Sequence, residues 1–415
     1  MNAEIIAIGS ELLTPYRQDT NSLFLTGKLN QLGIEVSFKT IVGDRRADLV
    51  SVARTALSRA DLIIFMGGLG PTEDDLTREC VAETLGRPLQ RDAKIVEDLR
   101  ARFASRGWTM SENNAQQGDI IPGAEVLDNK RGSAPGQFVQ IEDAVARKII
   151  ILLPGPPHEL TAMFEQQCME RLQKLVPVRH IAMRELKIAM IGESMADKRA
   201  AAIYTKHAGV ETTILAGSPG EVQLHLRAQA ESLEEAQKKV DVLASALEDE
   251  FEDAIFSTQG ESLEQIAGYY LGMREATLAV AESCTGGLLA ERITSVPGSS
   301  RYFLGGAVVY DNSLKTALAG VPPLMISEYG AVSSQVAAAL AEGIRKRCHA
   351  TLGVGITGVA GPGGGTEEKP VGLVFAALAD ENHTEVVERK FPGDRDRIRH
   401  WATQLALDMV RRKLM

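Results

Sequence analysis

The sequence predicts an α/β protein in which two α/β domains are joined by a small α+β unit. Short, wholly apolar runs such as residues 62–66 and 149–153 alternate with amphipathic helical patterns, and glycine- and proline-rich segments follow several of them. Residues 221–230 instead alternate apolar and polar side chains. Wholly apolar strands between helices are typical of a doubly wound parallel sheet, whereas alternation is typical of a half-exposed antiparallel strand.

A chain of 415 residues is long enough for two or three domains that each bury a core. We place the domains at residues 1–172, 173–257 and 258–415, because the pattern loses its period near residue 172 and Pro177 interrupts it. The hydrophobic content of 44% and the charged content of 24% are those of a soluble globular protein, not of a disordered chain.

Charge and cysteine usage narrow the choice of partners. The net charge of −10 argues against nucleic acid as a partner, but it allows a small phosphorylated ligand. The four cysteines show neither CxxC nor zinc spacing, which fits a reducing cytoplasm. The N-terminus begins directly with a strand pattern and no apolar run approaches membrane-spanning length, so we expect a cytoplasmic protein without a membrane partner.

The first domain is predicted to be a doubly wound parallel sheet. Its expected strands are residues 4–9, 34–42, 62–66 and 148–153, and its expected helices are residues 19–32, 49–60, 76–85 and 91–106, with another after residue 160. Two of the strands end in the glycine- and proline-rich segments 67–75 and 154–160. Open α/β sheets bind ligands at the carboxyl ends of their strands, so we expect a ligand site there.

Two carboxylates of the first domain also follow strands. Asp44 comes after the second strand and Asp75 after the third, so both side chains are expected to reach one crevice. Carboxylates in such a crevice suit a divalent cation that is itself bound to phosphates. The alternative for Asp74 and Asp75 is that they cap the following helix.

The middle unit is expected to be a spacer or dimerisation module. We predict strands at residues 186–191, 212–216 and 221–230 and helices at residues 193–208 and 232–251. The long second helix carries more acids than bases, which disfavours RNA binding.

The third domain is predicted to be a second α/β domain. Its expected strands are residues 276–280, 302–310, 352–356, 370–378 and 385–391, and its expected helices are residues 263–271, 288–293, 333–347 and 397–414. Three of the strands are followed by segments with reactive side chains, which are Ser283-Cys284-Thr285, Tyr310 with Lys315, and Thr357.

These segments suggest a nucleophile and a base. None of the seven histidines lies in them, so Lys315 is the available base for Ser283, with Tyr310 relaying a proton or orienting the lysine. Cys284 is intrinsically the better nucleophile, but cysteine nucleophiles usually need a histidine. The Gly286 and Gly287 amides at a helix start are expected to hold an oxyanion. The glycine loop 358–365, together with Arg395 or Arg399, suits a ligand phosphate.

At this point several motifs show a family resemblance. Residues 281–287 (AESCTGG), 305–315 (GGAVVYDNSLK), 355–372 (GITGVAGPGGGTEEKPVG) and 391–395 (FPGDR) resemble the nicotinamide mononucleotide amidohydrolase domain. Residues 9–13 (GSELL), 19–22 (DTNS), 67–77 (GGLGPTEDDLT) and 154–160 (PGPPHEL) resemble the molybdopterin-binding domain of molybdenum cofactor enzymes. Joined by a small KH-like unit, the two resemble the CinA family of competence/damage-inducible proteins over essentially the whole chain.

The resemblance implies roles for individual residues. In the C-terminal domain it implies Ser283 as nucleophile, supported by Tyr310, Lys315 and Thr357, and a substrate site that comprises Thr285, Gly286, Gly287, Gly361, Gly363, Gly364, Arg395 and Arg399. In the N-terminal domain it implies a nucleotide site that comprises Glu11, Asn21, Gly67, Gly68, Gly70, Thr72, Gly155 and Pro156, with Asp44 and Asp75 as metal ligands.

The implied function is a hydrolase of pyridine nucleotide salvage. The C-terminal domain would convert nicotinamide mononucleotide to nicotinate mononucleotide and ammonia without a cofactor. The N-terminal domain would act as an ADP-ribose pyrophosphatase that needs a divalent cation and potassium. A homodimer is implied as well. The alternative is a nucleotide- or pterin-binding scaffold protein linked to competence or the DNA damage response.

Overall fold

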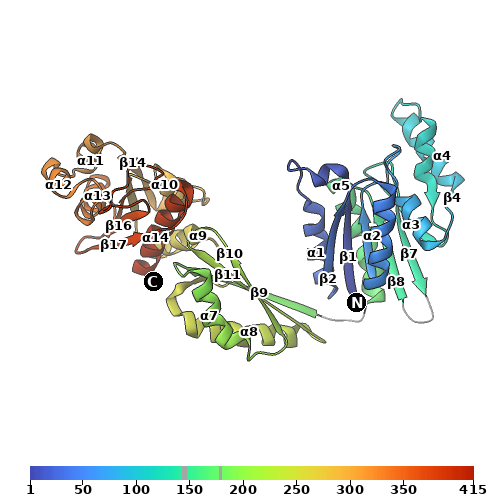
Figure 1. Ribbon diagram of the computed structural model, residues 1–415, viewed down its shortest axis with the longest axis horizontal. Coiled ribbons are helices and arrows are strands. Elements are labelled where there is room, and N and C mark those ends of the chain that lie inside the picture. The colour runs from blue at the N-terminus through green and yellow to red at the C-terminus, as the bar shows by residue number, and fades with distance from the viewer. Residues whose placement is uncertain (143–146, 177–179) are drawn as a thin grey trace. The chain divides into compact units, whose positions relative to one another are not determined.

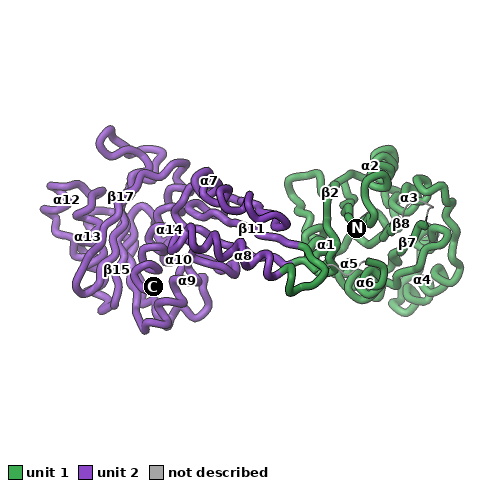
Figure 2. Tube along the Cα trace, turned by 90° about the horizontal axis from the view of Figure 1, so that it is seen from below, with its two compact units in different colours: residues 1–181, 229–236 green, residues 182–228, 237–415 purple. Residues whose placement is uncertain are grey.

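The computed structural model describes residues 1–142, 147–176 and 180–415, so the predicted boundary residue Pro177 lies outside the described residues. The chain forms two compact units, residues 1–181 with 229–236 and residues 182–228 with 237–415 (Figure 2). The predicted mixture of helices and sheets is confirmed (Figure 1).

The first unit contains a six-stranded sheet. Its elements are β1 (Asn2–Ile8), α1 (Thr20–Gln31), β2 (Glu35–Val42), α2 (Arg46–Arg59), β3 (Leu62–Met66), α3 (Thr77–Leu85), β4 (Gln90–Arg91), α4 (Ala93–Ser105), β5 (Asp119–Ile120), β6 (Ala124–Leu127), β7 (Gly136–Glu142), β8 (Arg147–Leu153), α5 (Pro157–Met163) and α6 (Met169–Leu175). The order is β2-β1-β3-β8-β7-β6, in which the first four strands are parallel. The four parallel strands are those of the predicted doubly wound sheet, and strands β7 and β6, which were not predicted, extend it as antiparallel additions.

Both faces of the sheet are covered at its centre, which is why the central strand β3 is wholly apolar and buried. Along β1, Ile5 and Ala7 pack into one buried cluster with residues of α1 and α5, whereas Ile6 and Ile8 pack into another with residues of α2 and α3. The predicted domain boundary at residue 172 falls inside α6. Leu172 is buried in the first of these clusters, so α6 belongs to the core of this unit.

The second sheet has four strands. Its elements are β9 (His180–Ala189), α7 (Glu193–Tyr204), β10 (Val210–Ala216), β11 (Glu221–Ala230), α8 (Leu233–Phe251) and β12 (Ile255–Ser257), with the strand order β10-β11-β9-β12. The predicted alternating strand at residues 221–230 is β11, and every second side chain of it is buried. Ala189 of β9 and Phe256 of β12 belong to the core cluster of the third sheet, so the second compact unit contains both sheets.

The third sheet has five strands. Its elements are α9 (Leu263–Met273), β13 (Leu278–Glu282), α10 (Leu288–Thr294), β14 (Phe303–Val308), α11 (Asn312–Ala319), α12 (Pro323–Tyr329), α13 (Ser334–Cys348), β15 (Leu352–Gly358), β16 (Leu373–Ala379), β17 (Thr384–Lys390) and α14 (Arg395–Leu414). The order is β14-β13-β15-β16-β17, with β14, β13 and β15 parallel and the last two strands antiparallel. The carboxyl ends of the three parallel strands therefore meet at one edge.

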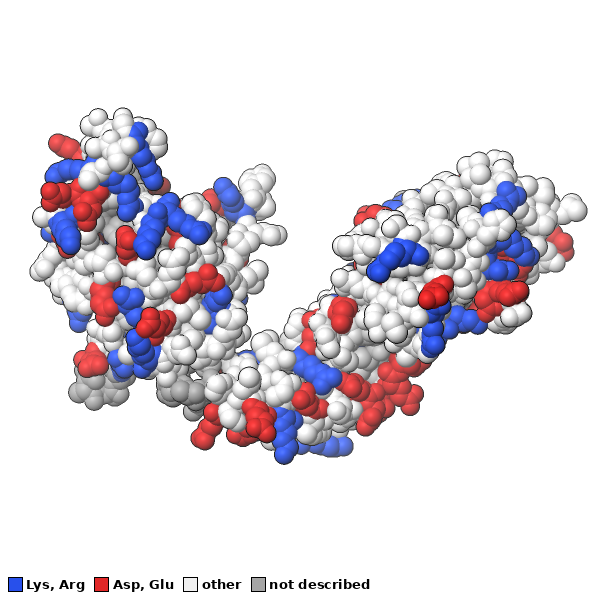
Figure 3. All heavy atoms as spheres, turned by 180° about the vertical axis from the view of Figure 1, so that it is seen from behind, with Lys and Arg blue, Asp and Glu red and all other residues white. Residues whose placement is uncertain are grey.

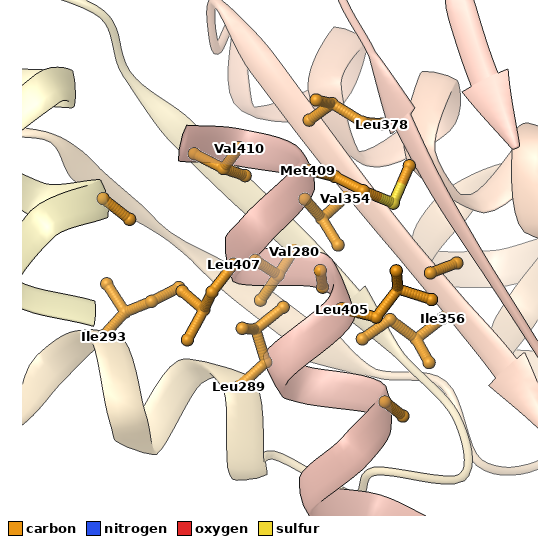
Figure 4. Packing of buried hydrophobic residues seen from close by; sticks show 14 of the residues in the cluster. Val280, Leu289, Ile293, Val354, Ile356, Leu378, Leu405, Leu407, Met409 and Val410 are labelled. Carbon is orange, nitrogen blue, oxygen red and sulfur yellow. The ribbon is translucent and has the colours of Figure 1, made fainter. Parts of the chain in front are cut away.

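Helix α14 packs against one face of this sheet. Figure 4 shows Leu405 and Met409 of α14 among side chains of β13, β15 and β16, including Val280 and Val354. On the opposite face, Ala279 and its neighbours on β13 pack against residues of α11 and α13. Alternate side chains of β13 thus pack into the two layers on opposite faces of the sheet.

The surface agrees with the balance of charge in the sequence. Figure 3 shows lysine and arginine interspersed with aspartate and glutamate over the face in view. Across the residues that the structure describes, no helix is both long enough and apolar enough to cross a membrane.

Candidate functional site

The turn between β13 and α10 carries Ser283, Cys284 and Thr285. Backbone hydrogen bonds tie it to both neighbouring strands: the N–H of Ser283 donates to the carbonyl of Ile356 (3.0 Å), and the N–H of Val309 donates to that of Glu282 (2.8 Å). Ile356 precedes the predicted Thr357, and Val309 precedes the predicted Tyr310. The three reactive segments therefore begin side by side, where β13, β14 and β15 end.

The Gly286 and Gly287 amides are not free to hold an oxyanion, which corrects the prediction. The N–H of Gly286 donates to the carbonyl of Ser283 (3.1 Å), and that of Gly287 donates to Oε2 of Glu282 (3.1 Å). The Glu282 carboxylate, which is buried, also accepts from the N–H groups of Leu289 (3.0 Å) and Ala290 (2.8 Å). The Glu282 carboxylate thus accepts hydrogen bonds from backbone N–H groups at the N-terminal end of α10, which have no partner within the helix.

Lys315 lies on helix α11, not in a loop as the sequence suggested. Its side chain is only 2% exposed, and Nζ donates to the carbonyls of Val309 (3.0 Å) and Tyr310 (3.1 Å). Within the described part of the chain, Lys315 forms no ion pair with a carboxylate. Burial lowers the pKa of Lys315, an effect that attraction to Asp311 and Cys284 opposes. Burial therefore favours the neutral amine, the form that can accept a proton.

The environment of Cys284 differs from that of the adjacent Ser283. The Cys284 side chain belongs to the hydrophobic core cluster, and burial raises the pKa of its thiol to about 12. The thiolate is the nucleophilic form of cysteine, so this environment keeps Cys284 unreactive.

Two predicted threonines line the same turn region. Thr357 is buried, and its Oγ1 donates to the carbonyl of Ala331 (2.8 Å). Thr285 is fully buried, and its Oγ1 has no hydrogen-bond partner among the described residues. The Thr285 hydroxyl is therefore an unused donor one residue beyond Cys284.

Two arginines of α14 hold the surrounding loops. Arg395 donates from Nη1 to the carbonyl of Gly361 (2.7 Å) and from Nη2 to the hydroxyl of Tyr310 (2.8 Å), which is 58% exposed. Arg399 donates twice to the carbonyl of Thr285 (3.2 and 2.8 Å). Since they lie four residues apart, both project from one side of the helix. Gly363 and Gly364 lie in the exposed part of the glycine loop.

The N-terminal unit has its site in a cavity of about 710 Å³ at the carboxyl ends of β1, β3 and β8. All ten residues predicted for this domain line it: Glu11, Asn21, Asp44, Gly67, Gly68, Gly70, Thr72, Asp75, Gly155 and Pro156. The side chain of Asn21 donates to the carbonyl of Gly155 (2.8 Å), which joins the start of α1 to the segment after β8. The volume is in the range of small-molecule sites.

The capping alternative for Asp74 and Asp75 is wrong. Helix α3 begins at Thr77, and no side chain caps it. Both carboxylates accept from the hydroxyl of Thr72 instead, and Asp75 Oδ2 also accepts from the Thr72 N–H (2.9 Å). Gly70 has no room for a side chain, because a Cβ there would lie 2.3 Å from Asp75 Oδ2. The loop therefore wraps around Asp75.

The carboxylates Asp44 and Asp75 fit a cation that is shared with phosphates. Asp44 uses Oδ2 to accept from the N–H of Ser10 (2.8 Å), which follows β1, and Asp75 uses Oδ2 to accept from Thr72 in its own loop, so a second oxygen remains on each. Among the described residues, no three His, Cys, Asp or Glu side chains converge as a complete metal cage. Mg²⁺ is commonly held by one or two carboxylates plus the phosphates of a substrate, so this pair is compatible with that mode.

Sequence reasoning missed other residues of this cavity. Gln117, Ser133 and Glu159 line it as well. Glu159 belongs to the motif at residues 154–160, which was a usable signal. Gln117 and Ser133 lie in segments without a recognisable motif, and only the fold brings them to the cavity.

Comparison with known proteins assigns the N-terminal and the C-terminal domain to two different family models. Residues 260–414 match the family model of the CinA C-terminal domain, and residues 4–174 match that of a probable molybdopterin binding domain. A CinA-like protein of Koribacter versatilis is 63% identical over 415 residues, which are 100% of both chains. This chain belongs to the CinA family. The resemblance of the sequence motifs to the CinA family is therefore confirmed.

Other relatives of this CinA family member carry related names. A putative competence-damage inducible protein of Moorella thermoacetica is 43% identical, over 100% of this chain and 99% of the relative. A crystal structure of the competence/damage inducible protein CihA from Agrobacterium tumefaciens is 38% identical, covers 35% of this chain and 92% of its own, and has a TM-score of 0.35.

Proposed function

We propose that the C-terminal domain hydrolyses the carboxamide of nicotinamide mononucleotide, giving nicotinate mononucleotide and ammonia. The observation that carries this proposal is the buried Lys315, which has no carboxylate partner among the described residues and is joined through Val309 to the turn of Ser283. A neutral lysine beside a serine hydroxyl is the arrangement that activates serine where histidine is lacking.

The proposed reaction proceeds in two steps. Neutral Lys315 takes the proton of the Ser283 hydroxyl as Oγ attacks the carboxamide carbon, and the ammonium of Lys315 then protonates the departing nitrogen, which leaves as ammonia. Water next attacks the acyl-serine ester while Lys315 accepts a proton from it, and Lys315 returns that proton to Oγ of Ser283 as the ester bond breaks and the acid is released. The unused hydroxyl of Thr285 is the donor that we assign to the oxyanion, because the glycine amides of this turn are bonded elsewhere.

The test is release of ammonia from nicotinamide mononucleotide by the purified full chain, in the presence of a chelator. We expect turnover under these conditions, because the proposed route uses only Ser283 and Lys315 to move protons. Activity that disappears with chelator and returns with added zinc, or an absence of ammonia release at any pH, would contradict the proposal.

We also propose that the N-terminal cavity hydrolyses ADP-ribose to AMP and ribose 5-phosphate. The supporting observation is that Asp44, Asp75 and two glycine-rich segments line one cavity of about 710 Å³. A divalent cation held by the two carboxylates would neutralise and polarise the diphosphate. The protein itself would orient the diphosphate. Asp75 accepts a hydrogen bond that fixes the loop of Thr72, and Asn21 donates one that fixes the loop of Gly155.

This second activity is tested by following AMP formation from ADP-ribose with and without Mg²⁺, and with and without added potassium. Formation of AMP that depends on Mg²⁺ is the expected result. Tight binding of ADP-ribose or of a pterin without turnover would instead favour the alternative, a binding or scaffold role for this domain.

A further inference from the structure

The wall of the N-terminal cavity contains a buried hydrogen-bond acceptor that the fold leaves unused. Gln117 lies in the short 3₁₀ helix Glu112–Gly118, and its side chain is 1% exposed. Its Nε2 donates to Oγ of Ser133 (3.2 Å), whereas its Oε1 has no partner among the residues that the structure describes. Both residues line the cavity. Buried polar atoms are rarely left without a partner, so the oxygen calls for an explanation.

A second buried glutamine in the same unit shows that this fold can satisfy such a side chain. Gln137 of β7 is fully buried, its Oε1 accepts from the N–H of Ile121 (2.9 Å), and its Nε2 donates to the carbonyl of Asp119 (3.0 Å). Gln137 does not line the cavity. Of these two buried glutamines, the one with an unpartnered oxygen is therefore Gln117, which lines the cavity.

A carboxylate is fixed in the same wall. Oε2 of Glu159, on α5, accepts from Nδ2 of Asn129 (2.7 Å), a group that also donates to the carbonyl of Ala134. Gly132 lies directly against it, because a Cβ there would be 1.9 Å from the same oxygen. Among the described residues, the one basic nitrogen within 4 Å of Oε1 of Glu159 is Nε2 of His158, at 3.9 Å. This wall therefore presents acceptors, and an acceptor surface repels phosphate and suits hydroxyl groups.

We propose that Gln117 and Glu159 determine specificity in this cavity by accepting hydrogen bonds from the hydroxyls of a ligand sugar. The inference rests on the proposed nucleotide site, and it assigns a second function to a different part of the same cavity. Asp44 and Asp75 hold the cation and the diphosphate, whereas Gln117 and Glu159 select ligands in which that diphosphate carries a sugar. An acidic side chain that binds ribose hydroxyls is a recurring device in α/β nucleotide sites.

The test compares two probes that share the same bridged phosphorus groups. One is a methylene-bridged ADP-ribose that cannot be cleaved, and the other is methylenediphosphonate, which has no sugar. Binding of each to the full chain is measured by titration calorimetry with Mg²⁺. Gln117→Met keeps the length of the side chain and removes its acceptor. We expect it to weaken binding of the ADP-ribose analogue about ten- to a hundredfold and to leave methylenediphosphonate unaffected.

Gln137→Met is the matched control. It strands the N–H of Ile121 and the carbonyl of Asp119, so it should lower the melting temperature and leave the ratio of the two affinities unchanged. Gln117→Met removes the unpartnered oxygen together with the single hydrogen bond from Nε2 to Ser133, so it should lower the melting temperature of the free protein less than Gln137→Met does. Glu159→Gln, which keeps the shape of the side chain and weakens its acceptor, should shift the affinity ratio in the same direction as Gln117→Met.

Each outcome separates the inference from the proposed function. If the wild type binds both probes and Gln117→Met weakens both equally, or neither, the assignment of Gln117 is wrong while the nucleotide site stands. If Gln117→Met lowers the melting temperature as much as Gln137→Met does, its role is structural. If the wild type binds neither probe, the proposed nucleotide site is wrong and the inference falls with it.

Discussion

The sites of the two α/β domains are built in opposite ways. In the C-terminal domain Ser283, Lys315 and Thr357 are nearly inaccessible, and two arginines and one glutamate bond the surrounding loops to one another. In the N-terminal domain Asp44 and Asp75 are partly exposed and line an open cavity of about 710 Å³. A buried site is organised by its own protein and can tune a lysine, whereas an open acidic site needs a cation and a ligand to complete it.

The sharpest test of this contrast is removal of the proposed nucleophile. Ser283→Ala should lower kcat for nicotinamide mononucleotide on the order of 10⁴- to 10⁶-fold and leave ADP-ribose hydrolysis unchanged. Cys284→Ala is the matched control, because the raised pKa of its buried thiol keeps it protonated. Steady-state ammonia release measures both variants. If Cys284→Ala were inactive and Ser283→Ala nearly normal, the nucleophile would be Cys284 and not Ser283.

Lys315→Met should cost about 10²- to 10⁴-fold in amidase activity, because it removes the general base. In the wild type the base must be neutral, so kcat should rise with pH through the lowered pKa of Lys315. The double variant with Ser283→Ala should be little worse than Ser283→Ala alone, since the two residues act as one unit. A rate profile for the wild type that is flat with pH would argue against Lys315 as base.

The same lysine links pH to stability. Between its lowered pKa in the fold and its ordinary pKa in the unfolded chain, the unfolded state binds more protons. The free energy of unfolding should therefore rise with pH across that window, and Lys315→Met should lack this rise. Urea unfolding at a series of pH values measures the difference, and equal slopes for both proteins would show that burial does not shift this pKa.

In the open site, Asp75→Asn should reduce ADP-ribose hydrolysis on the order of 10²- to 10³-fold and leave the amidase intact. Asp74→Asn is the comparison, because Asp74 lines the same cavity and accepts from the same Thr72 hydroxyl but is more exposed than Asp75. Added Mg²⁺ should partly restore Asp75→Asn, since the defect lies in cation affinity. Equal losses for the two variants, without rescue, would indicate that Asp75 only holds its loop.

The smallest expected effect concerns the support of the buried site. Glu282→Gln weakens a carboxylate that accepts from the N–H groups of Gly287, Leu289 and Ala290, so it should lower the free energy of unfolding by about 1.5–3 kcal/mol. Among the described residues that line the open cavity, no carboxylate accepts from three backbone N–H groups, so this cost is specific to the buried site. Chemical denaturation checks it, and an unchanged midpoint would show that water replaces the carboxylate.

Many strands and helices could be predicted from the sequence, because the pattern of apolar and polar side chains within each segment reflects which of its faces are buried. Residues 62–66 are wholly apolar because both faces of β3 are covered, and residues 221–230 alternate because one face of β11 is not. The missed elements had weaker local signals. Strands β6 and β7 lie at an edge of their sheet, and the helix of Lys315 is only eight residues long.

The sequence by itself determined which strands end in reactive segments, and hence the neighbourhood of Ser283, Lys315 and Asp75. Only the tertiary structure decided how the polar atoms there are used. Glu282 takes the amides that a helix start would otherwise offer, and Gln117 meets Ser133 across sixteen residues of chain. The physical reason is that a hydrogen bond depends on which donor and acceptor the fold brings within about 3 Å, and local sequence pattern does not encode that distance.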